Sequence, residues 1–429
     1  MTPPGRAADL SGARVLVGIG GGIAAYKAAH LVRGLVGVGA EVRVVPTAAS
    51  LEFVGRATWE ALSHHPVLTS VFEQVDEVAH VRHGQEADLT IVAPATADLL
   101  ARMRAGRADD MLTASLLVTR GPVVVAPAMH TEMWEHPATR ENVAVLRERG
   151  TIVLEPAVGR LTGPDSGAGR LPEPEAILAA ARAVLAAPRA EDGAVRRDLA
   201  GRTVLVTAGG TREELDPVRY LGNHSSGKQG WALAHAALAR GARVQLLAAN
   251  VDLETPPGAE RVDVGSAAEL AEAVEARLDG VDALVMAAAV ADFTAASRSG
   301  DKIKKDESQP DSVPVLALAR TRDILRHSVE VRSVSSHPAR PVIAGFAAET
   351  GGEGGTALEL GAQKARRKGA DLLVLNDVST GVFGAEDNAV RILDAQGEIR
   401  GEASGSKVTV AHAVLDALVP RLPVLPWDA

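Results

Sequence analysis

The most informative absence from this sequence is cysteine. None of the 429 residues is a cysteine, which excludes disulfides, thiolate metal sites and a thiol nucleophile. Aromatic residues make up only 3% of the chain and hydrophobic residues 46%, so we expect aliphatic cores with helices packed closely on sheets. The net charge is −9 and no basic tract occurs, so we do not expect nucleic acid as a partner.

Long apolar runs and two common nucleotide motifs are missing as well. No stretch is long enough to span a bilayer, and the first residues lack the apolar core of a signal peptide, so we expect a cytoplasmic protein with no membrane partner. Neither the Walker A pattern GxxxxGK[ST] nor the dinucleotide fingerprint GxGxxG is present. The length favours two or more domains over one.

The first half of the chain alternates buried strands with helices. A short apolar run at 14–19 is followed by three glycines, a helix-period segment at 23–36 and a strand at 41–45, which predict a β-α-β unit with a glycine turn. The same half contains predicted strands at 88–93, 122–126 and 151–154, a glycine-rich loop at 159–169 and a helix at 175–186. This pattern is typical of a parallel sheet covered on both faces, with ligands at the carboxyl ends of its strands.

A polar, charged segment at 188–201 has no apolar period and predicts a linker. The α/β pattern then starts again. It comprises a strand at 203–207, a helix at 231–240 and later strands at 243–248, 281–289, 341–346 and 371–375. The two halves share an architecture without an internal repeat that can be aligned.

The stretch Gly209–Gly230, between a buried strand and a helix, is the strongest candidate for a ligand site. It ends in Ser225, Ser226, Gly227 and Lys228. These residues combine close backbone approach, hydroxyls that can cap N–H groups, and a positive charge at a helix N-terminus, which together suit an anion such as phosphate. An ordinary capped helix preceded by a hairpin is the alternative interpretation.

Two groups of lysines could add to such a site. The polar segment 297–312 carries Lys302, Lys304 and Lys305, and it is either a solvated loop or a lid over a polyanion. A helix predicted over 356–368 places Lys364 and Lys368 on one face. That face is either simply solvated or a second clamp on phosphates.

Several short motifs occur in one order along the chain. They are GGIAAYK (21–27), APATADL (93–99), PAMHTEMW (127–134), TAGGTREELDPVRYLGNHSSGKQG (207–230), AAAVADF (287–293), KIKK (302–305), GFAAET (345–350) and NDVS (376–379). With this ordered set, the chain resembles the bacterial bifunctional phosphopantothenoylcysteine decarboxylase / phosphopantothenate–cysteine ligase family of coenzyme A synthesis. The resemblance covers nearly the whole chain.

The resemblance implies an α/β protein with two domains, both with mainly parallel sheets. Residues 1–189 would form a flavodoxin-like FMN decarboxylase domain, and residues 190–429 a Rossmann-like CTP-dependent ligase domain. FMN would oxidise the substrate thiol to a thioaldehyde so that CO₂ can leave, and would then return a hydride. The residues that suit FMN are Gly21, Gly22, Thr47, Thr96 and Ser115.

The resemblance also implies roles for polar residues of the first domain. His80 matches the family's catalytic histidine, as a base or an anchor for the carboxylate, although His83 could exchange roles with it. Arg160 and Arg170 could bind the substrate phosphate.

The chain departs from the family in two places. His130 stands where the family's PAMN loop has asparagine, and the cysteine that protonates the enethiolate is absent. Thr162 lies near the position of that cysteine, but a hydroxyl is a far poorer acid. Water, Asp165 or His130 could donate the proton instead.

For the second domain the resemblance implies an acyl-cytidylate intermediate. Asn223 would stabilise this intermediate, Lys302 would be the catalytic lysine, and Arg219 would contact substrate. The residues expected to bind the nucleotide are Ser225, Ser226, Gly227, Met286, Ala287, Ala288, Asp292, Lys302, Thr321, Arg322, Asp323, Ile324, Phe346, Lys364 and Lys368. The segment Thr321–Ile324 reads TRDI where the family has NPDI.

The expected substrates are phosphopantothenate, cysteine and CTP. Mg²⁺ is expected with the triphosphate, although no carboxylate cluster in the sequence identifies its ligands. Family members form trimers through one half and dimers through the other, which suggests a homo-oligomer, a dodecamer. Two other interpretations remain: a ligase whose flavin half is only a binding or oligomerisation module, and a two-domain nucleotide-binding oxidoreductase, against which the missing GxGxxG argues.

Overall fold

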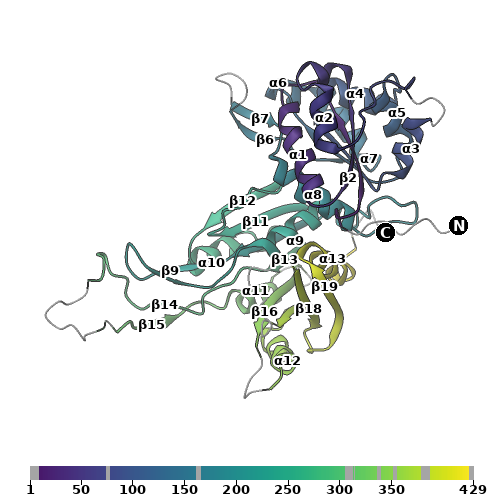
Figure 1. Cartoon of the computed structure of the whole chain (residues 1–429). Coiled ribbons are helices and arrows are strands. Elements are labelled where there is room, and N and C mark those ends of the chain that lie inside the picture. Colours follow the sequence, from purple (N-terminus) through teal and green to yellow (C-terminus); the bar gives the residue numbers. More distant parts are fainter. Residues whose placement is uncertain are drawn as a thin grey trace. The chain divides into compact units, whose positions relative to one another are not determined.

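The computed structural model describes residues 9–73, 78–160, 166–304, 313, 315–335, 340–350, 355–377 and 387–424. The chain divides into two compact units: Met1–Arg197 with Glu254–Gly258, and Asp198–Leu253 with Ala259–Ala429. The predicted α/β class with two mainly parallel sheets is confirmed (Figure 1). The predicted boundary after residue 189 remains a proposal.

The first unit is built on a parallel sheet in the order β2-β1-β3-β4-β5. Its strands are β1 Arg14–Ile19, β2 Glu41–Pro46, β3 Leu89–Ala95, β4 Val123–Pro127 and β5 Ile152–Val153. The order reverses between β1 and β3, and flavodoxin-like sheets bind their ligand at that point. Continuous apolar runs explain the burial of both faces of β3, all seven residues of which are buried.

Helices cover both faces of this sheet. One side carries α1 Ala25–Gly37 against α8 Pro174–Ala186, and the other carries helices that share one hydrophobic cluster with the strands. The helices contributing to that cluster are α3 Ala79–Glu86, α4 Ala97–Ala105, α5 Met111–Val118 and α7 Pro137–Glu148; the remaining helices are α2 Arg56–Ser63, α6 Thr131–Glu135 and the short η1 Ala48–Glu52.

The segment predicted as a glycine-rich loop at 159–169 is different in the structure. Strands β6 Ala157–Arg160 and β7 Ser166–Arg170 pair antiparallel around residues 161–165. Alternating small residues let the two strands pair although their composition is typical of a loop. Thr162 and Asp165 lie outside the described residues.

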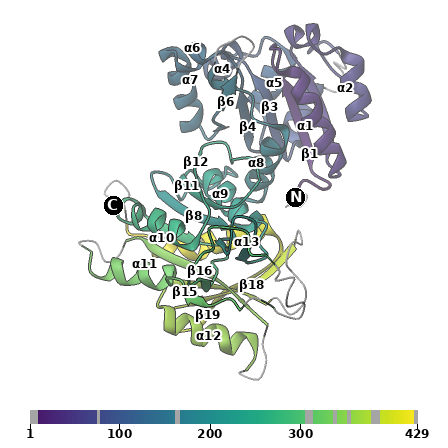
Figure 2. The same ribbon diagram turned by 90° about the vertical axis from the view of Figure 1, so that its left-hand side faces the viewer.

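The second unit contains a longer sheet in the order β12-β11-β8-β13-β16-β17-β18-β19 (Figures 1 and 2). The strands from β12 to β17 are parallel, and the last two are antiparallel. The bounds are β8 Thr203–Gly209, β11 Arg243–Ala249, β12 Ala259–Val264, β13 Ala283–Met286, β16 Val342–Glu349, β17 Leu372–Asp377, β18 Asp387–Asp394 and β19 Ile399–Ser406. The strands from β12 to β17 have the strand order of a Rossmann fold. This order reverses between β8 and β13, which is the switch point of the sheet.

Two hydrophobic clusters hold helices against the two faces of this sheet. On one face lie α9 Lys228–Ala239 and α13 Lys407–Leu418, which also contact each other. On the other lie α10 Ala267–Glu275, α11 Ile324–Ser333 and α12 Ala357–Lys368. Two single turns, η3 Leu278–Gly280 and η5 Val419–Arg421, also occur in this unit.

Two antiparallel ribbons extend the second unit. Strand β9 Arg212–Glu214 pairs with β10 Tyr220–Gly222, and β14 Phe293–Ala295 pairs with β15 Leu318–Arg320. The stretch 209–230 is therefore not one long loop, because a hairpin interrupts it, and the following helix begins at Lys228 instead of at 231.

The end of the predicted linker belongs to the second unit. Leu199 is fully buried, and Asp198 accepts hydrogen bonds from Nε and Nη2 of Arg240 at 2.7 and 2.6 Å. Arg240 is itself fully buried and also donates to Asp416 at 2.8 Å. Removing one partner of such a buried pair typically costs about 3–5 kcal/mol, so this contact anchors the start of the unit.

A buried histidine gives the second unit a dependence on pH. His235 lies inside α9, and its burial lowers its pKa to about 4. The folded state therefore binds this proton more weakly than the unfolded state, whose histidine titrates near 6.5. As far as His235 is concerned, the full stability of the unit is present above pH 6.5, the pKa of the histidine in the unfolded state. Stability is lost as the pH falls from 6.5 towards 4, because the unfolded state then takes up the proton first.

We predict that His235→Leu makes stability less sensitive to acid. Between pH 7.5 and pH 5 the wild type should lose about 1–2 kcal/mol more than the variant, measured by urea unfolding at both values. The exposed His30 serves as a control, because His30→Leu should keep the wild-type pH dependence. Equal pH dependence of wild type and His235→Leu would contradict this account.

Candidate functional site

The glycine turn after β1 lies between the loops that follow β2 and β3. Gly20 N donates to the Pro94 carbonyl at 2.9 Å, and a Cβ on Gly20 would lie 2.4 Å from that oxygen. A Cβ on Gly21 would lie 2.5 Å from the Cβ of Ala49, and one on Gly22 would lie 3.5 Å from Thr96. A side chain therefore does not fit at Gly20 or Gly21, whereas a Cβ at Gly22 would make an ordinary van der Waals contact.

The predicted threonines border the same turn. Thr47 Oγ1 donates to the Ile19 carbonyl at 3.1 Å, and Thr96 caps α4 by accepting from Leu99 N at 3.3 Å. Gly21, Gly22, Thr47 and Thr96 therefore gather at the carboxyl edge of the strands, at the switch point between β1 and β3. The cradle fits a flavin phosphate, whose oxygens accept from backbone N–H groups and hydroxyls.

Ser115, the remaining residue predicted to bind FMN, is fully buried in α5. Its hydroxyl donates to the Met111 carbonyl at 2.8 Å, and a Cβ on Gly84 of α3 would lie 2.5 Å from the Ser115 carbonyl oxygen. Ser115 thus belongs to the tight contact between α3 and α5.

His80 and His83 occupy different places although both lie on α3. His83 lines a cavity of about 20 Å³ with Arg14 and Glu41, which begin β1 and β2. His80 stands about 4.5 Å nearer the helix start, because each helical residue rises about 1.5 Å. Its Nδ1 is buried and has no hydrogen-bond partner among the described residues. His80 is thus the better candidate for contact with a ligand.

His130 lies beside the β6–β7 hairpin. It is exposed at the start of α6, and the neighbouring Met129 N donates to the Gly169 carbonyl at 2.9 Å. The hairpin carries the predicted arginines: Arg160 ends β6, and Arg170 ends β7 and bonds to Glu173. The hairpin thus brings Arg170 next to the loop that holds His130, and Arg160 lies at the other end of the ribbon, opposite Ser166.

Glu173 joins that arginine to α1. Its carboxylate also accepts from Lys27 Nζ at 2.8 Å. Burial raises the pKa of Glu173, but the hydrogen bonds from Lys27 and Arg170 outweigh burial and leave the pKa below its ordinary value. The carboxylate therefore stays ionised and orients Arg170.

In the second unit a closely packed turn follows β8. Gly209 has φ +90°, and a Cβ there would lie 2.1 Å from the Ala249 carbonyl oxygen. Gly210 passes under Asn223, whose carbonyl oxygen would lie 3.1 Å from a Cβ on Gly210. Asn223 is exposed at this edge of the sheet.

The serines before α9 do not cap it as expected. Gly227 is the N-cap residue, with φ +75°, and no side chain caps the helix from that position. Ser225 Oγ instead accepts from Gly227 N at 3.4 Å. The helix N-terminus is therefore presented to the adjoining cavity, which suits an anion.

That cavity has a volume of about 180 Å³ and lies between α9, β13 and β16. It brings together several residues predicted to bind the nucleotide, namely Ser225, Ser226, Gly227, Ala287, Ala288 and Phe346. His224, Lys228 and Lys407 also line it, and no carboxylate does so among the described residues. Its lining favours an anionic ligand.

Sequence reasoning missed part of this cavity. Gln229, Asn376, Asn388 and Lys407 also line it. Gln229 Nε2 donates to the Lys407 carbonyl at 3.1 Å and accepts at Oε1 from Asn388 at 3.3 Å. The motifs at 207–230 and 376–379 contain Gln229 and Asn376, whereas Asn388 and Lys407 come from a strand and a helix that no motif marked.

The remaining nucleotide-site residues form a second group near the ends of β13 and β16. Thr321 N donates to the Asp292 carbonyl at 3.1 Å, and Asp323 caps α11. Met286 and Ile324 are buried in the core, so only their backbone could meet a ligand. Arg322 pairs with Glu275 at 2.9 Å.

Both predicted clamp lysines have carboxylate partners. Lys364 Nζ lies 3.0 Å from Glu349, and Lys368 donates to Asp323 at 2.5 Å. Burial raises the pKa of Asp323, but its hydrogen bonds from Lys368 and Arg326 N outweigh burial and lower the pKa overall. A triphosphate would have to compete with these carboxylates for the two lysines.

Arg219 and Lys302 meet through the backbone of Ile303. Arg219 Nη2 donates to the Ile303 carbonyl at 2.6 Å, and its guanidinium also bonds to Asp216. Lys302, the neighbour of Ile303, is exposed.

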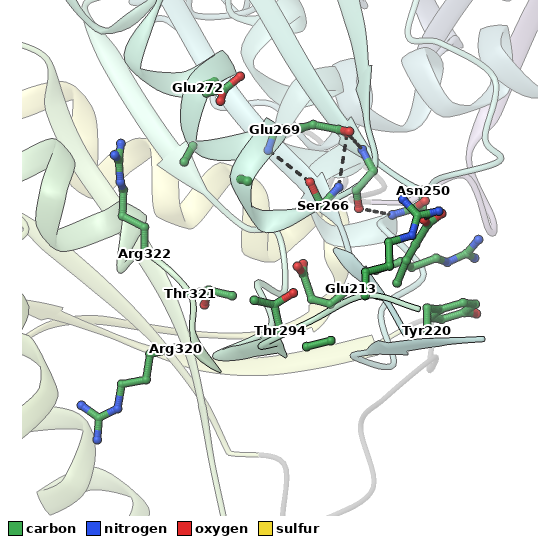
Figure 3. A pocket seen from close by; sticks show the side chains of 17 residues that line it. Glu213, Tyr220, Asn250, Ser266, Glu269, Glu272, Thr294, Arg320, Thr321 and Arg322 are labelled. Atoms are coloured by element: carbon green, nitrogen blue, oxygen red, sulfur yellow. Dashed lines mark hydrogen bonds and ion pairs between the residues drawn. The ribbon is translucent and has the colours of Figure 1, made fainter. Parts of the chain in front are cut away.

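A larger cavity, of about 890 Å³, lies between the two ribbons and the start of α10 (Figure 3). Thr321 and Arg322 line it, together with Arg212, Arg298 and Arg320. Glu213, Glu214, Glu269 and Glu272 also line it, so guanidinium groups and carboxylates occur in equal number. This balance suits a polyphosphate less well than the smaller cavity does.

Family models match both units. The model described as flavoprotein matches residues 6–186, and the model described as DNA/pantothenate metabolism flavoprotein C-terminal domain matches residues 199–421. The chain is 53% identical over 411 residues to the coenzyme A biosynthesis bifunctional protein CoaBC of Mycobacterium tuberculosis (strain ATCC 25618 / H37Rv), covering 95% of this chain and 97% of that protein. It is 40% identical over 417 residues to the protein of the same name from Escherichia coli (strain K12), covering 96% and 98%.

Solved structures are similar to parts of the chain. The C-terminal domain of coenzyme A biosynthesis bifunctional protein CoaBC is 33% identical, covers 52% of this chain and 97% of its own, and has a TM-score of 0.41. The FMN binding protein AtHal3 is 31% identical, covers 40% and 95%, and has a TM-score of 0.37. Among the described residues, no helix is long and apolar enough to cross a membrane, and no cluster of three metal-ligating side chains occurs.

We predict that Gly21→Ala weakens FMN binding roughly tenfold or more, because the new Cβ would displace the loop at Ala49. Flavin absorbance of the purified protein and titration with free FMN measure this. Gly37→Ala is the matched control, since a Cβ at Gly37 meets nothing within 4 Å. Unchanged FMN affinity of Gly21→Ala would exclude the glycine turn as the flavin site.

Proposed function

This chain belongs to the family of coenzyme A biosynthesis bifunctional proteins CoaBC, and we propose that it joins cysteine to phosphopantothenate with CTP and then decarboxylates the product with FMN. Identity of 53% across 95% of the chain carries the proposal. Each unit also has a glycine turn at the switch point of its sheet, where α/β proteins bind nucleotide-like ligands.

In the first unit, Gly21, Gly22, Thr47 and Thr96 would hold FMN directly, and Ser115, which is fully buried, would contribute by fixing α5 against α3. FMN supplies a two-electron acceptor beside the substrate thiol. His80 would act as base or carboxylate anchor, since its unpartnered Nδ1 can bond to a substrate oxygen. Arg160 and Arg170 would hold the substrate phosphate from the hairpin, with Arg170 oriented by Glu173.

The chain has no cysteine, so another group in this unit has to donate the proton that the enethiolate takes up. His130 is exposed beside the hairpin, and an imidazolium can donate a proton where the family uses a thiol. We assign His130 this role. The ligase-only alternative would hold if the unit binds FMN without releasing CO₂.

In the second unit, the cavity at the start of α9 would take phosphates of CTP. The substrate carboxylate attacks the α-phosphorus, the bond to the bridging oxygen breaks, and pyrophosphate leaves with that electron pair. The cysteine amine then attacks the acyl carbon and loses a proton, and CMP leaves. Lys302 and the N–H groups of α9 would stabilise charge on the phosphoryl oxygens, and Asn223 would bond to the acyl-cytidylate.

The cytidine end would lie against the second group of residues. Phe346 lines the cavity with Ala287 and Ala288, and Met286 precedes them at the end of β13. Asp292, Thr321, Arg322, Asp323 and Ile324 would surround the base and the sugar, and Lys364 and Lys368 would contact the phosphates. We further propose that Mg²⁺ enters with the triphosphate, since the described residues offer no cluster of three metal-ligating side chains that would hold it beforehand.

We also propose self-association, ultimately as a dodecamer in the cytoplasm. The ribbons of the second unit expose apolar side chains, including Val218 at 61%, Tyr220 at 52% and Phe293 at 46%. A second copy of the same ribbons would bury them, as isologous dimers do.

We predict that His80→Asn and Lys302→Ala separate the two activities. His80→Asn should stop CO₂ release from phosphopantothenoylcysteine and spare CTP-dependent pyrophosphate release, because the two residues lie in different units. Lys302→Ala should abolish pyrophosphate release and leave FMN bound. Continued CO₂ release by His80→Asn, or wild-type pyrophosphate release by Lys302→Ala, would refute the corresponding assignment.

We predict that Lys407→Met raises KM for CTP about tenfold or more, because one cation of an all-positive cavity is lost. Arg391→Gln is the matched control, since Arg391 is an exposed cation on β18 paired with Glu402. Steady-state kinetics at varied CTP measure both. Equal KM values for Lys407→Met and the control would remove Lys407 from the site.

A further inference from the structure

The turn between β9 and β10 is built around one buried carboxylate. Asp216 is 1% exposed, and its Oδ1 accepts from Val218 N at 2.8 Å and from Arg219 N at 2.9 Å. Its Oδ2 accepts from Arg219 Nε at 2.9 Å. These bonds close the turn and orient the arginine.

The same carboxylate reaches a segment more than eighty residues away in sequence. Ile303 N donates to Asp216 Oδ2 at 3.1 Å, and the Ile303 carbonyl accepts from Arg219 Nη2 at 2.6 Å. The Asp216–Arg219 pair therefore holds both backbone polar groups of Ile303. A second contact lies four residues earlier, where Ser299 N donates to the Leu215 carbonyl at 3.0 Å.

Between these contacts the chain carries Lys302. Its side chain is exposed while the backbone next to it is tied to the turn. A lysine side chain has large rotational freedom, so its ammonium group can be placed usefully only if its backbone origin is held.

The carboxylate of Asp216 is suited to holding these backbone and side-chain donors, because an ionised carboxylate only accepts hydrogen bonds. The hydrogen bonds from Arg219 lower the pKa of Asp216 well below its ordinary value, so it stays ionised at every working pH. An amide in its place has one oxygen that accepts, and its NH₂ group would face a donor on the other side. Asp216→Asn therefore keeps the shape of the residue and breaks either the bonds from Ile303 N and Arg219 Nε or the bonds from Val218 N and Arg219 N that close the turn.

We propose that Asp216 is a positioning residue for the ligase reaction: paired with Arg219, it holds the backbone of Ile303 so that Lys302 extends towards the reacting phosphate. This inference rests on the proposed role of Lys302 with CTP. It also gives Arg219 a second task besides contact with substrate.

The test compares Asp216→Asn with Asp301→Asn in the full-length protein loaded with FMN. Asp301 is exposed and one residue before Lys302, so its substitution removes the same charge near the lysine without touching the Asp216–Arg219 pair. Asp216→Asn should lower kcat for CTP-dependent pyrophosphate release at least tenfold and change KM for CTP less than threefold. Asp301→Asn should stay within twofold of wild type in both values, and CO₂ release should be unchanged in both variants.

Limited trypsin digestion supplies an independent readout of the backbone. Cleavage after Lys302 and Lys304, followed by mass spectrometry, should be several-fold faster in Asp216→Asn than in wild type or Asp301→Asn. If Asp216→Asn proves unfolded by circular dichroism, Asp216→Glu takes its place, with the same expected loss of kcat because the carboxylate is displaced by one methylene.

The outcomes separate this inference from the proposed function. Wild-type pyrophosphate release by Lys302→Ala overturns the role of Lys302 itself. Loss of activity in Lys302→Ala, together with wild-type kcat and wild-type cleavage in the Asp216 variant, overturns only the positioning role. A rise in KM for CTP without a fall in kcat also overturns it, because Asp216 would then act in binding.

Discussion

The structure depends on close backbone contact at the end of the first strand of each unit. A Cβ on Gly20 would lie 2.4 Å from the Pro94 oxygen, and one on Gly209 would lie 2.1 Å from the Ala249 oxygen. At both places the sheet order reverses, so loops from neighbouring strands have to pass one another at the carboxyl edge. The glycines that allow this passage lie at the edge of the sheet where, in our proposal, each unit binds a different ligand.

Most of the parallel strands could be predicted, because a strand buried on both faces needs a continuous apolar run that is visible in sequence. The antiparallel ribbons could not. Strands β6 and β7 are rich in glycine, and β9 and β10 are only three residues long each and mostly exposed, so neither pair has the continuous apolar run of a buried strand. The start of α9 was predicted too late in the chain for a related reason. Gly227 and Lys228 have the composition of a loop, yet Gly227, with φ +75°, is the N-cap residue and the helix begins at Lys228.

The candidate sites were predictable where a motif is continuous in sequence. The residues from Ser225 to Gly227 line one cavity together with Ala287, Ala288 and Phe346, as three separate motifs suggested. Lys407 and Asn388 reach the same cavity only through the pairing of β18 and the packing of α13 on α9, which no local pattern encodes. Nor could the sequence predict two ion pairs, that of Lys364 with Glu349 and that of Lys368 with Asp323. Charge alone does not identify a partner that is distant in sequence.

The central claim is that one chain carries both reactions in spite of its missing cysteine. The most direct test supplies the wild-type protein with CTP, phosphopantothenate and cysteine, and follows pyrophosphate and CO₂ in one reaction. Our account predicts CTP-dependent pyrophosphate release, followed by CO₂ release that approaches the same total amount. Pyrophosphate without any CO₂, from protein with FMN bound, would leave only the ligase, and the absence of CTP-dependent pyrophosphate would contradict the account altogether.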